Sequence, residues 1–243
     1  MVQEWGEPFL LADWVDVLMI HLEVEPAPLQ RSTPFALDLF DGRAFVSRVA
    51  FTMRRMRPRL GGRWAAWCFR PIATHPFFNV RTYVRHENQV GIHFLAEWVP
   101  NRWSLRLGPQ SFGLPYRLGR LDYGHRFGGE PGEFAGSVID GPSGTGFRYR
   151  TGRVQGEFGP CEAGSLESWL MERYTAFTHC RGVSRYFRVW HPPWRRTRLD
   201  VELVDQTLLT THWPCLQGAE VVGASGSPGF EDVWMGRPRR GKR

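Results

Sequence analysis

Two residues that could bind an organic acid stand close together in the sequence, Arg81 and Tyr83. A guanidinium group inside a protein binds a carboxylate or phosphate through paired hydrogen bonds, and a tyrosine hydroxyl can orient the ligand. Glu97 becomes a general base if burial raises its pKa. Alternatively, Arg81 pairs with Glu97 and only supports the fold, because buried charges are usually paired. The candidate ligand-binding residues are Asn79, Arg81, Tyr83, His93, Glu97 and Tyr116, with no catalytic residue and no metal ligand assigned.

A predicted β-hairpin, with strands over 79–86 and 90–98, positions most of these side chains. A three-residue turn at 87–89 keeps the even positions on one apolar face and the odd positions on one polar face. The predicted cross-strand pairs are Tyr83 with His93 and Asn79 with Glu97. The polar face then either lines a cavity inside a barrel or faces water.

Other polar residues have both a functional and a structural interpretation. Tyr116 follows a Leu-Pro turn, where it covers the mouth of a cavity or packs as a buried aromatic. Glu172 and Arg173 lie on a predicted helix, and they either reach the sheet or form a structural ion pair. His191 precedes two prolines, in a rigid bend where a histidine can titrate or serve only the turn.

Strand signals dominate the rest of the chain, with apolar and polar residues alternating between Gly- and Pro-containing turns. Besides the hairpin, strands are predicted over 43–51, 133–140, 146–154, 184–190 and 198–204, and helices over 101–107 and 165–178. The predicted fold class is α+β and mainly antiparallel β, a closed barrel with a few packed helices. A single domain is expected over 9–217, between a short tail at 1–8 and a flexible, basic tail rich in Gly, Ser and Pro at 218–243.

The composition excludes several kinds of chemistry. Lys242 is the single lysine, so the body of the fold offers no amine for a Schiff base and no lysine for a phosphate-binding loop. Four cysteines show no metal-binding spacing, and no cofactor is expected. The net charge is +7, but five basic residues lie within 237–243, which leaves +2 on the rest of the chain.

Charge and hydropathy also restrict the partners. A basic segment with tryptophans beside it, Arg54 to Trp67, could grip phosphates, yet the nearly neutral body makes nucleic acid an unexpected partner. No apolar run is long enough to span a membrane, and no leader peptide is evident. The sequence therefore predicts a cytoplasmic protein with a small-molecule carboxylate as ligand, and it leaves a homo-oligomer open.

Five motifs occur in an order that resembles one known family. They are Asp38-Leu-Phe-Asp-Gly-Arg-Ala-Phe-Val-Ser-Arg-Val-Ala-Phe51, Asn79-Val-Arg-Thr-Tyr-Val84, Leu114-Pro-Tyr116, Gly164-Ser-Leu-Glu-Ser-Trp-Leu-Met-Glu-Arg-Tyr174 and His191-Pro-Pro-Trp194. Over roughly residues 10–212 the chain resembles the YqjF-like family, a domain of unknown function in the acetoacetate decarboxylase superfamily. Phe77 departs from the family pattern, which has an acidic residue there.

The resemblance implies a closed, largely antiparallel β-barrel with an internal cavity. It implies no established activity for the family. The wider superfamily decarboxylates acetoacetate through a Schiff-base lysine, and this chain lacks a lysine where that is possible. The expected function is that of a barrel that binds a small molecule resembling an organic acid. If the protein is an enzyme, it is expected to act on this ligand without Schiff-base chemistry. The alternatives are a non-catalytic structural or interaction protein and, third, a nucleic-acid-associated protein.

Overall fold

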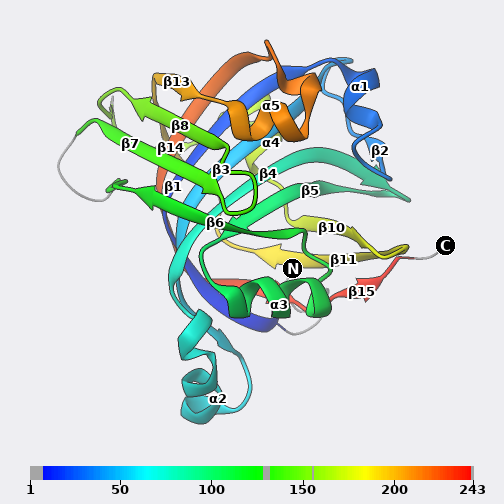
Figure 1. Cartoon of the computed structure of the whole chain (residues 1–243), viewed down its shortest axis with the longest axis vertical. Coiled ribbons are helices and arrows are strands. Elements are labelled where there is room, and N and C mark those ends of the chain that lie inside the picture. The colour runs from blue at the N-terminus through cyan, green and yellow to red at the C-terminus, as the bar shows by residue number, and fades with distance from the viewer. Residues whose placement is uncertain (1–7, 128–131, 155, 242–243) are drawn as a thin grey trace.

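The computed structural model describes residues 8–127, 132–154 and 156–241 of the chain. Its main element is a curved sheet whose strand pairings close into a ring (Figure 1). In order around the ring, the strands are β1 (Pro8–Val24), β3 (Ala44–Pro58), β4 (His75–His86), β5 (Gln89–Val99), β10 (Thr175–Cys180), β11 (Val183–Trp190) and β14 (Glu220–Gly236). Neighbours are antiparallel except β5 and β10, which are parallel. The prediction of a mainly antiparallel, barrel-like fold is therefore confirmed.

A second sheet branches from the ring at β5. The middle of β5 pairs with β10, and its last residues pair with β6 instead. This sheet continues through β6 (Tyr116–Tyr123), β7 (Phe134–Asp140), β8 (Gly146–Thr151) and β13 (Val201–Asp205). The strands predicted over 133–140 and 146–154 are thus β7 and β8, with β8 ending three residues early.

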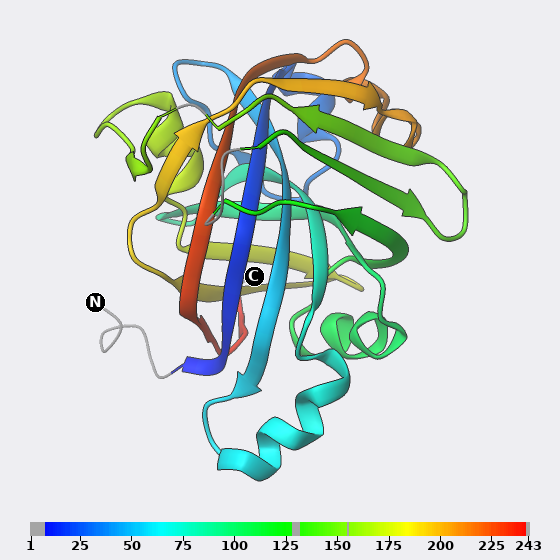
Figure 2. The same ribbon diagram turned by 90° about the vertical axis from the view of Figure 1, so that its left-hand side faces the viewer.

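Short elements lie at the edges and ends of the ring, and the helix after β3 projects away from it (Figure 2). The helices are α1 (Pro26–Gln30), α2 (Gly62–Phe69), α3 (Arg102–Ser111), α4 (Leu166–Met171) and α5 (Thr207–His212), with 3-10 turns η2 (Arg70–Ile72) and η3 (Pro214–Leu216). The remaining strands are β2 (Ala36–Leu37), β9 (Gly159–Pro160), β12 (Arg195–Arg198) and β15 (Arg239–Arg240). Within the described ranges, no helix is long and apolar enough to cross a membrane.

Two hydrophobic cores explain why the longest strands are apolar almost throughout. On β1, Val17 and Met19 belong to the core inside the ring, while Leu18 and Ile20 belong to a second core outside it. The second core fills the space between the ring wall, the β6–β7–β8–β13 sheet and α5. Strands buried on both faces carry apolar residues at successive positions, so simple alternation is lost.

The helix predicted over 165–178 is wrong in its second half. Ser165 caps α4 as expected, and its hydroxyl accepts the Ser168 backbone N–H. The helix ends at Met171, however, and residues 175–180 form strand β10 between β5 and β11. Threonines and an aromatic residue in this segment suit a pleated, buried surface, and pairing with two strands outweighs the apparent helical stripe. The turn that follows has positive φ at Arg181 and Gly182, as in a tight hairpin.

The predicted register of the β4–β5 hairpin is right at one end and wrong at the other. Asn79 faces Glu97 as expected. The turn, however, has two residues, and a register shift between Val80 and Arg81 separates the two halves of the hairpin. Tyr83 therefore faces Ile92 rather than His93. A β-bulge moves one strand by one residue, so the inward face of β5 changes from even to odd positions along its length.

The flexible tail predicted over 218–243 is also wrong for residues 220–236. They form β14, which pairs with β1 along nearly its whole length and with β11 and β12 (Figure 2). Small residues here serve close approach, since a Cβ at Gly226 would lie 2.5 Å from the Phe127 ring. The predicted tail at 1–8 falls almost entirely outside the described residues, as do Lys242 and Arg243.

Candidate functional site

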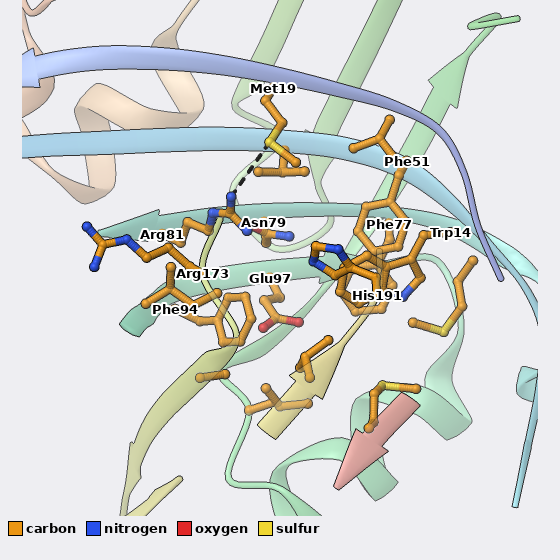
Figure 3. Close-up of a pocket in the computed structure, with 18 of the residues that line it drawn as sticks. Trp14, Met19, Phe51, Phe77, Asn79, Arg81, Phe94, Glu97, Arg173 and His191 are labelled. Carbon is orange, nitrogen blue, oxygen red and sulfur yellow. Dashed lines mark hydrogen bonds between the residues drawn. The ribbon is translucent and has the colours of Figure 1, made fainter. Parts of the chain in front are cut away.

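A small cavity of about 80 Å³ lies inside the ring (Figure 3). Its walls are mainly apolar and aromatic, with a few polar side chains among them. The polar lining residues are Asn79 and Arg81 on β4, Glu97 on β5, Tyr116 on β6, Arg173 just before β10, Thr175 at the start of β10, and His191 after β11. An enclosed apolar space with a few convergent polar groups is the usual form of a small-molecule site.

Arg81 is a buried cation without a carboxylate partner among the described residues. Its Nη2 lies 3.6 Å from the sulfur of Met19, and its Nε has no hydrogen-bond acceptor (Figure 3). Burial lowers the pKa of Arg81, the nearby Tyr83 hydroxyl raises it, and repulsion by Arg173 lowers it further. The alternative that Arg81 pairs with Glu97 is wrong, because no ion pair joins them and burial alone accounts for the shifted pKa of Glu97.

Glu97 is the second unsatisfied group of the cavity. It is fully buried, its Oε1 has no partner, and burial raises its pKa well above the usual value. Asn79 lies directly across the hairpin, and its Oδ1 is also unpaired. Tyr116 pairs with Glu97 across the β5–β6 register, and burial followed by the Glu97 charge raises its pKa well above the usual value. A neutral carboxylic acid can donate a proton or a hydrogen bond at this place.

Tyr83 and His93, the other two predicted ligand-binding residues, do not line the cavity. The Tyr83 hydroxyl donates to the Leu170 carbonyl at 3.0 Å and contacts the Ser47 hydroxyl, which is bonded to His21 Nδ1 at 2.7 Å. The bulge turns His93 to the opposite face of β5, where its Nδ1 lies 3.0 Å from the Phe177 carbonyl. The structure thus brings together Asn79, Arg81, Glu97 and Tyr116, and separates them from Tyr83 and His93.

Arg173 and His191 line the same cavity, although the sequence left both a functional and a structural role open for each. Arg173 binds Asp38 at 2.8 Å and the Trp169 carbonyl at 2.7 Å, yet its Nη2 remains without a partner. Asp38 also binds Arg85 at 2.6 Å, so one buried carboxylate serves two arginines. His191 Nδ1 lies 2.7 Å from the Pro192 carbonyl, and burial lowers the pKa of His191 to about 4.

The polar groups around the cavity therefore carry more positive than negative charge. Arg81 is unpaired, Arg173 shares its carboxylate, and burial favours the neutral form of Glu97. Within the described ranges, no group of three His, Cys, Asp or Glu residues is arranged to hold a metal ion. An anionic ligand that also accepts hydrogen bonds complements this arrangement.

Four buried histidines make the fold sensitive to acid. Burial lowers the pKa of His21 to about 3 and those of His93, His125 and His191 to about 4. In the unfolded chain these groups titrate near 6.5, so the folded state resists protonation. The stability they contribute is complete above pH 6.5 and is lost as the pH falls toward their lowered values. The buried His75 adds to this effect, since burial lowers its pKa as well, whereas the raised pKa values of Glu97 and Asp16 act in the opposite direction.

We expect the free energy of unfolding, measured with urea, to fall between pH 6.5 and pH 4.5. Each histidine contributes at most about 1.4 kcal/mol per pH unit. His93→Gln keeps a hydrogen-bond donor for the Phe177 carbonyl. It should reduce the slope of the unfolding free energy against pH by the contribution of about one proton. The comparison variant is His179→Gln, because His179 is exposed and acts on His93 only through its charge, so its substitution should change the slope less than His93→Gln does. Equal slopes for His93→Gln and the wild type would contradict a buried, neutral His93.

The ring of strands around this cavity is the acetoacetate decarboxylase-like fold. It is similar to the enduracididine biosynthesis enzyme MppR, complexed with the condensation product of pyruvate and imidazole 4-carboxaldehyde (TM-score 0.66, 15% identity, 97% of this chain and 90% of that chain). It is also similar to acetoacetate decarboxylase from Legionella pneumophila (TM-score 0.64, 12% identity, 98% and 89%). These likenesses concern the fold.

Comparison of the amino-acid sequence with family models establishes the family to which the chain belongs. The model of the family DUF2071, described as an uncharacterized conserved protein, matches residues 11–227, and the chain belongs to this family. A curated relative is the uncharacterized protein YqjF of Bacillus subtilis strain 168, which is 26% identical over 211 residues, or 82% of this chain and 79% of the relative. The match extends to Ser227, near the middle of β14, the strand mistaken for a tail.

Proposed function

We propose that the cavity binds the carboxylate group of a small organic acid, with Arg81 as the anchor. The observation that carries this proposal is a buried guanidinium that lines the cavity and that no carboxylate neutralises within the described chain. Desolvating a cation without a partner costs several kcal/mol, and a bound anion recovers much of that cost. The likeness of fold to MppR, which has also been solved in complex with pyruvate, supports an acid of this type.

The neighbouring polar groups suit the rest of such a ligand. Glu97 in its neutral form donates a hydrogen bond to a ligand oxygen, and Asn79 Oδ1 accepts one. If the protein is an enzyme, the chemistry at this site is proton transfer by Glu97, with Tyr116 and His191 beside the ligand. The only lysine of the sequence is Lys242, so a Schiff base is not part of the proposal.

The second candidate is a non-catalytic structural or interaction protein. The size of the polar cavity favours it, because about 80 Å³ is well below the roughly 300 Å³ usual for ligand sites. A structural protein, however, should have a satisfied polar interior. Unpaired atoms on Arg81, Glu97 and Asn79 argue for a ligand that is small or only partly inside this cavity.

Nucleic-acid binding has less support than either. The basic segment after Arg54 is partly neutralised, because Arg55 pairs with Asp13 and Glu231, and Arg57 pairs with Asp232. Paired arginines release fewer counterions on binding phosphates. Affinity for nucleic acid that falls steeply with salt would restore this candidate.

The proposal is tested by thermal unfolding in the presence of acetate, propionate and pyruvate, with propionamide as the uncharged control. At ligand concentrations ten times Kd, we expect the acids to raise the melting temperature by roughly 3–6 °C. Arg81→Met should abolish this shift. The matched control is Arg48→Met, because Arg48 is equally buried but lies in the outer core beside Phe147 and Gln206. Acid-induced stabilisation that persists in Arg81→Met would remove Arg81 as the anchor.

A further inference from the structure

A second, apolar cavity of about 460 Å³ adjoins the polar one, at the end of the ring next to α3. The two spaces share a wall of six side chains, Met53, Phe77, Leu114, Tyr116, Phe187 and Met235. The apolar lining of the rest of the larger cavity comes from the start of β1, from β3, α2 and η2, and from α3 and the residue after it: Phe9, Leu10, Met56, Phe69, Ile72, Leu107 and Phe112. Its volume is within the range usual for organic ligands, whereas that of the polar cavity is not.

Strand β4 connects the two cavities along one face. Its alternate residues begin with His75 in the apolar cavity, continue with Phe77 in the shared wall, and end with Asn79 and Arg81 in the polar cavity. Phe77 and Arg81 are four residues apart, which is about 13 Å along an extended strand. An acid held at Arg81 therefore reaches the apolar cavity only if it carries a carbon chain.

The shared wall can adapt to such a chain. Met53 and Met235 are unbranched and flexible, and methionine side chains rearrange readily around irregular ligands. Most polar groups of the apolar cavity already have partners or face solvent. His75 Nε2 and the Ser104 hydroxyl oxygen are 3.3 Å apart, the Ser111 hydroxyl donates to the Leu107 carbonyl at 2.7 Å, and Gln110 is exposed. This space therefore suits hydrocarbon rather than a second polar group.

We propose that the ligand is an amphipathic acid whose carboxylate binds Arg81 and whose hydrocarbon chain passes Phe77 into the apolar cavity. This inference rests on the proposed function and specifies its ligand class. It also explains how an 80 Å³ polar cavity can serve a larger ligand, since that cavity holds only the head of the molecule.

The test is a titration of the wild type with straight-chain monocarboxylic acids of two to ten carbons, followed by calorimetry. Once the chain enters the apolar cavity, each added methylene should tighten Kd roughly fourfold until the cavity is full. All titrations are made below the concentration at which the acids form micelles. An affinity for acetate and propionate that depends on Arg81 but does not rise with chain length would overturn this inference and leave the proposed function standing.

Variants of α3 test where the chain lies. Leu107→Trp and Ser111→Trp place bulk in the apolar cavity and should lower the ratio of decanoate to propionate affinity at least tenfold. The matched control is Val204→Trp on β13, since Val204 and Leu107 are similarly exposed at 48% and 46% and Val204 lines neither cavity. An unchanged ratio in both folded α3 variants would overturn the placement of the chain. Absence of Arg81-dependent binding by any acid, short or long, would overturn the proposed function itself.

Discussion

An Arg81→Met variant should be more stable than the wild type when no ligand is present, although it no longer responds to carboxylates. Methionine fills a similar volume, removes the desolvated charge and keeps the contact with Met19 apolar. Replacing buried charges by apolar residues of similar volume is often neutral or stabilising by about 1–4 kcal/mol. Such a gain in stability on loss of a binding group is typical of a functional site. Urea unfolding at pH 7 measures it.

Arg173→Met provides the contrasting result in the same cavity. Arg173 binds Asp38 and the Trp169 carbonyl, and its guanidinium lies 4.0 Å from the centre of the Trp169 ring. Its removal leaves the buried Asp38 carboxylate with Arg85 as its one remaining ion-pair partner among the described residues, and takes the side-chain donor from the Trp169 carbonyl. Breaking a buried pair in this way costs about 3–5 kcal/mol. If Arg81→Met destabilised the protein as strongly as Arg173→Met, Arg81 would have a structural role.

The amino-acid sequence indicates the polar half of the site well, because four of the six proposed residues are neighbours in the cavity. The two failures, His93 and Tyr83, have different causes. A single register shift beside Arg81 turns His93 outward, and no residue pattern in the hairpin marks this bulge. Tyr83 points inward as its parity predicts, but its hydroxyl is bonded to Leu170 and Ser47 from segments that lie far away in the sequence.

Some elements of the fold could not be predicted from the sequence because their structure depends on neighbouring strands from distant parts of the chain. The segment at 175–180 has helical spacing, and it becomes a strand because β5 and β11 lie on either side of it. Composition was misleading for β14, where Gly and Ser are typical of a linker. In a strand that packs closely under other side chains, the same residues are the ones that fit. Arg173 and His191 could be assigned to the cavity only once the ring had brought their segments together.

Removal of residues 218–243 is expected to prevent folding. β14 is the partner of β1 on one side and of β11 and β12 on the other, so its loss opens the ring. The inner core loses Val233 and Met235, and the long edge of β1 and short stretches of β11 and β12 are left without hydrogen-bond partners. A soluble truncated protein with a cooperative unfolding transition would contradict this role of β14.

Substitutions of two glycines of β14 test the packing of this strand in the full-length protein. A Cβ added at Gly226 would lie 2.5 Å from Phe127 Cε1 and 2.9 Å from Leu199 Cδ1, so Gly226→Ala should lower the free energy of unfolding by about 1–3 kcal/mol. At Gly223, three residues earlier on the same strand, a Cβ meets nothing within 4 Å. Gly223→Ala should therefore be neutral or raise stability by up to about 1 kcal/mol, because alanine loses less backbone entropy on folding. Similar effects of the two substitutions in urea unfolding would mean that the small residues of β14 are not required for packing, and that the Gly- and Ser-rich composition has another origin.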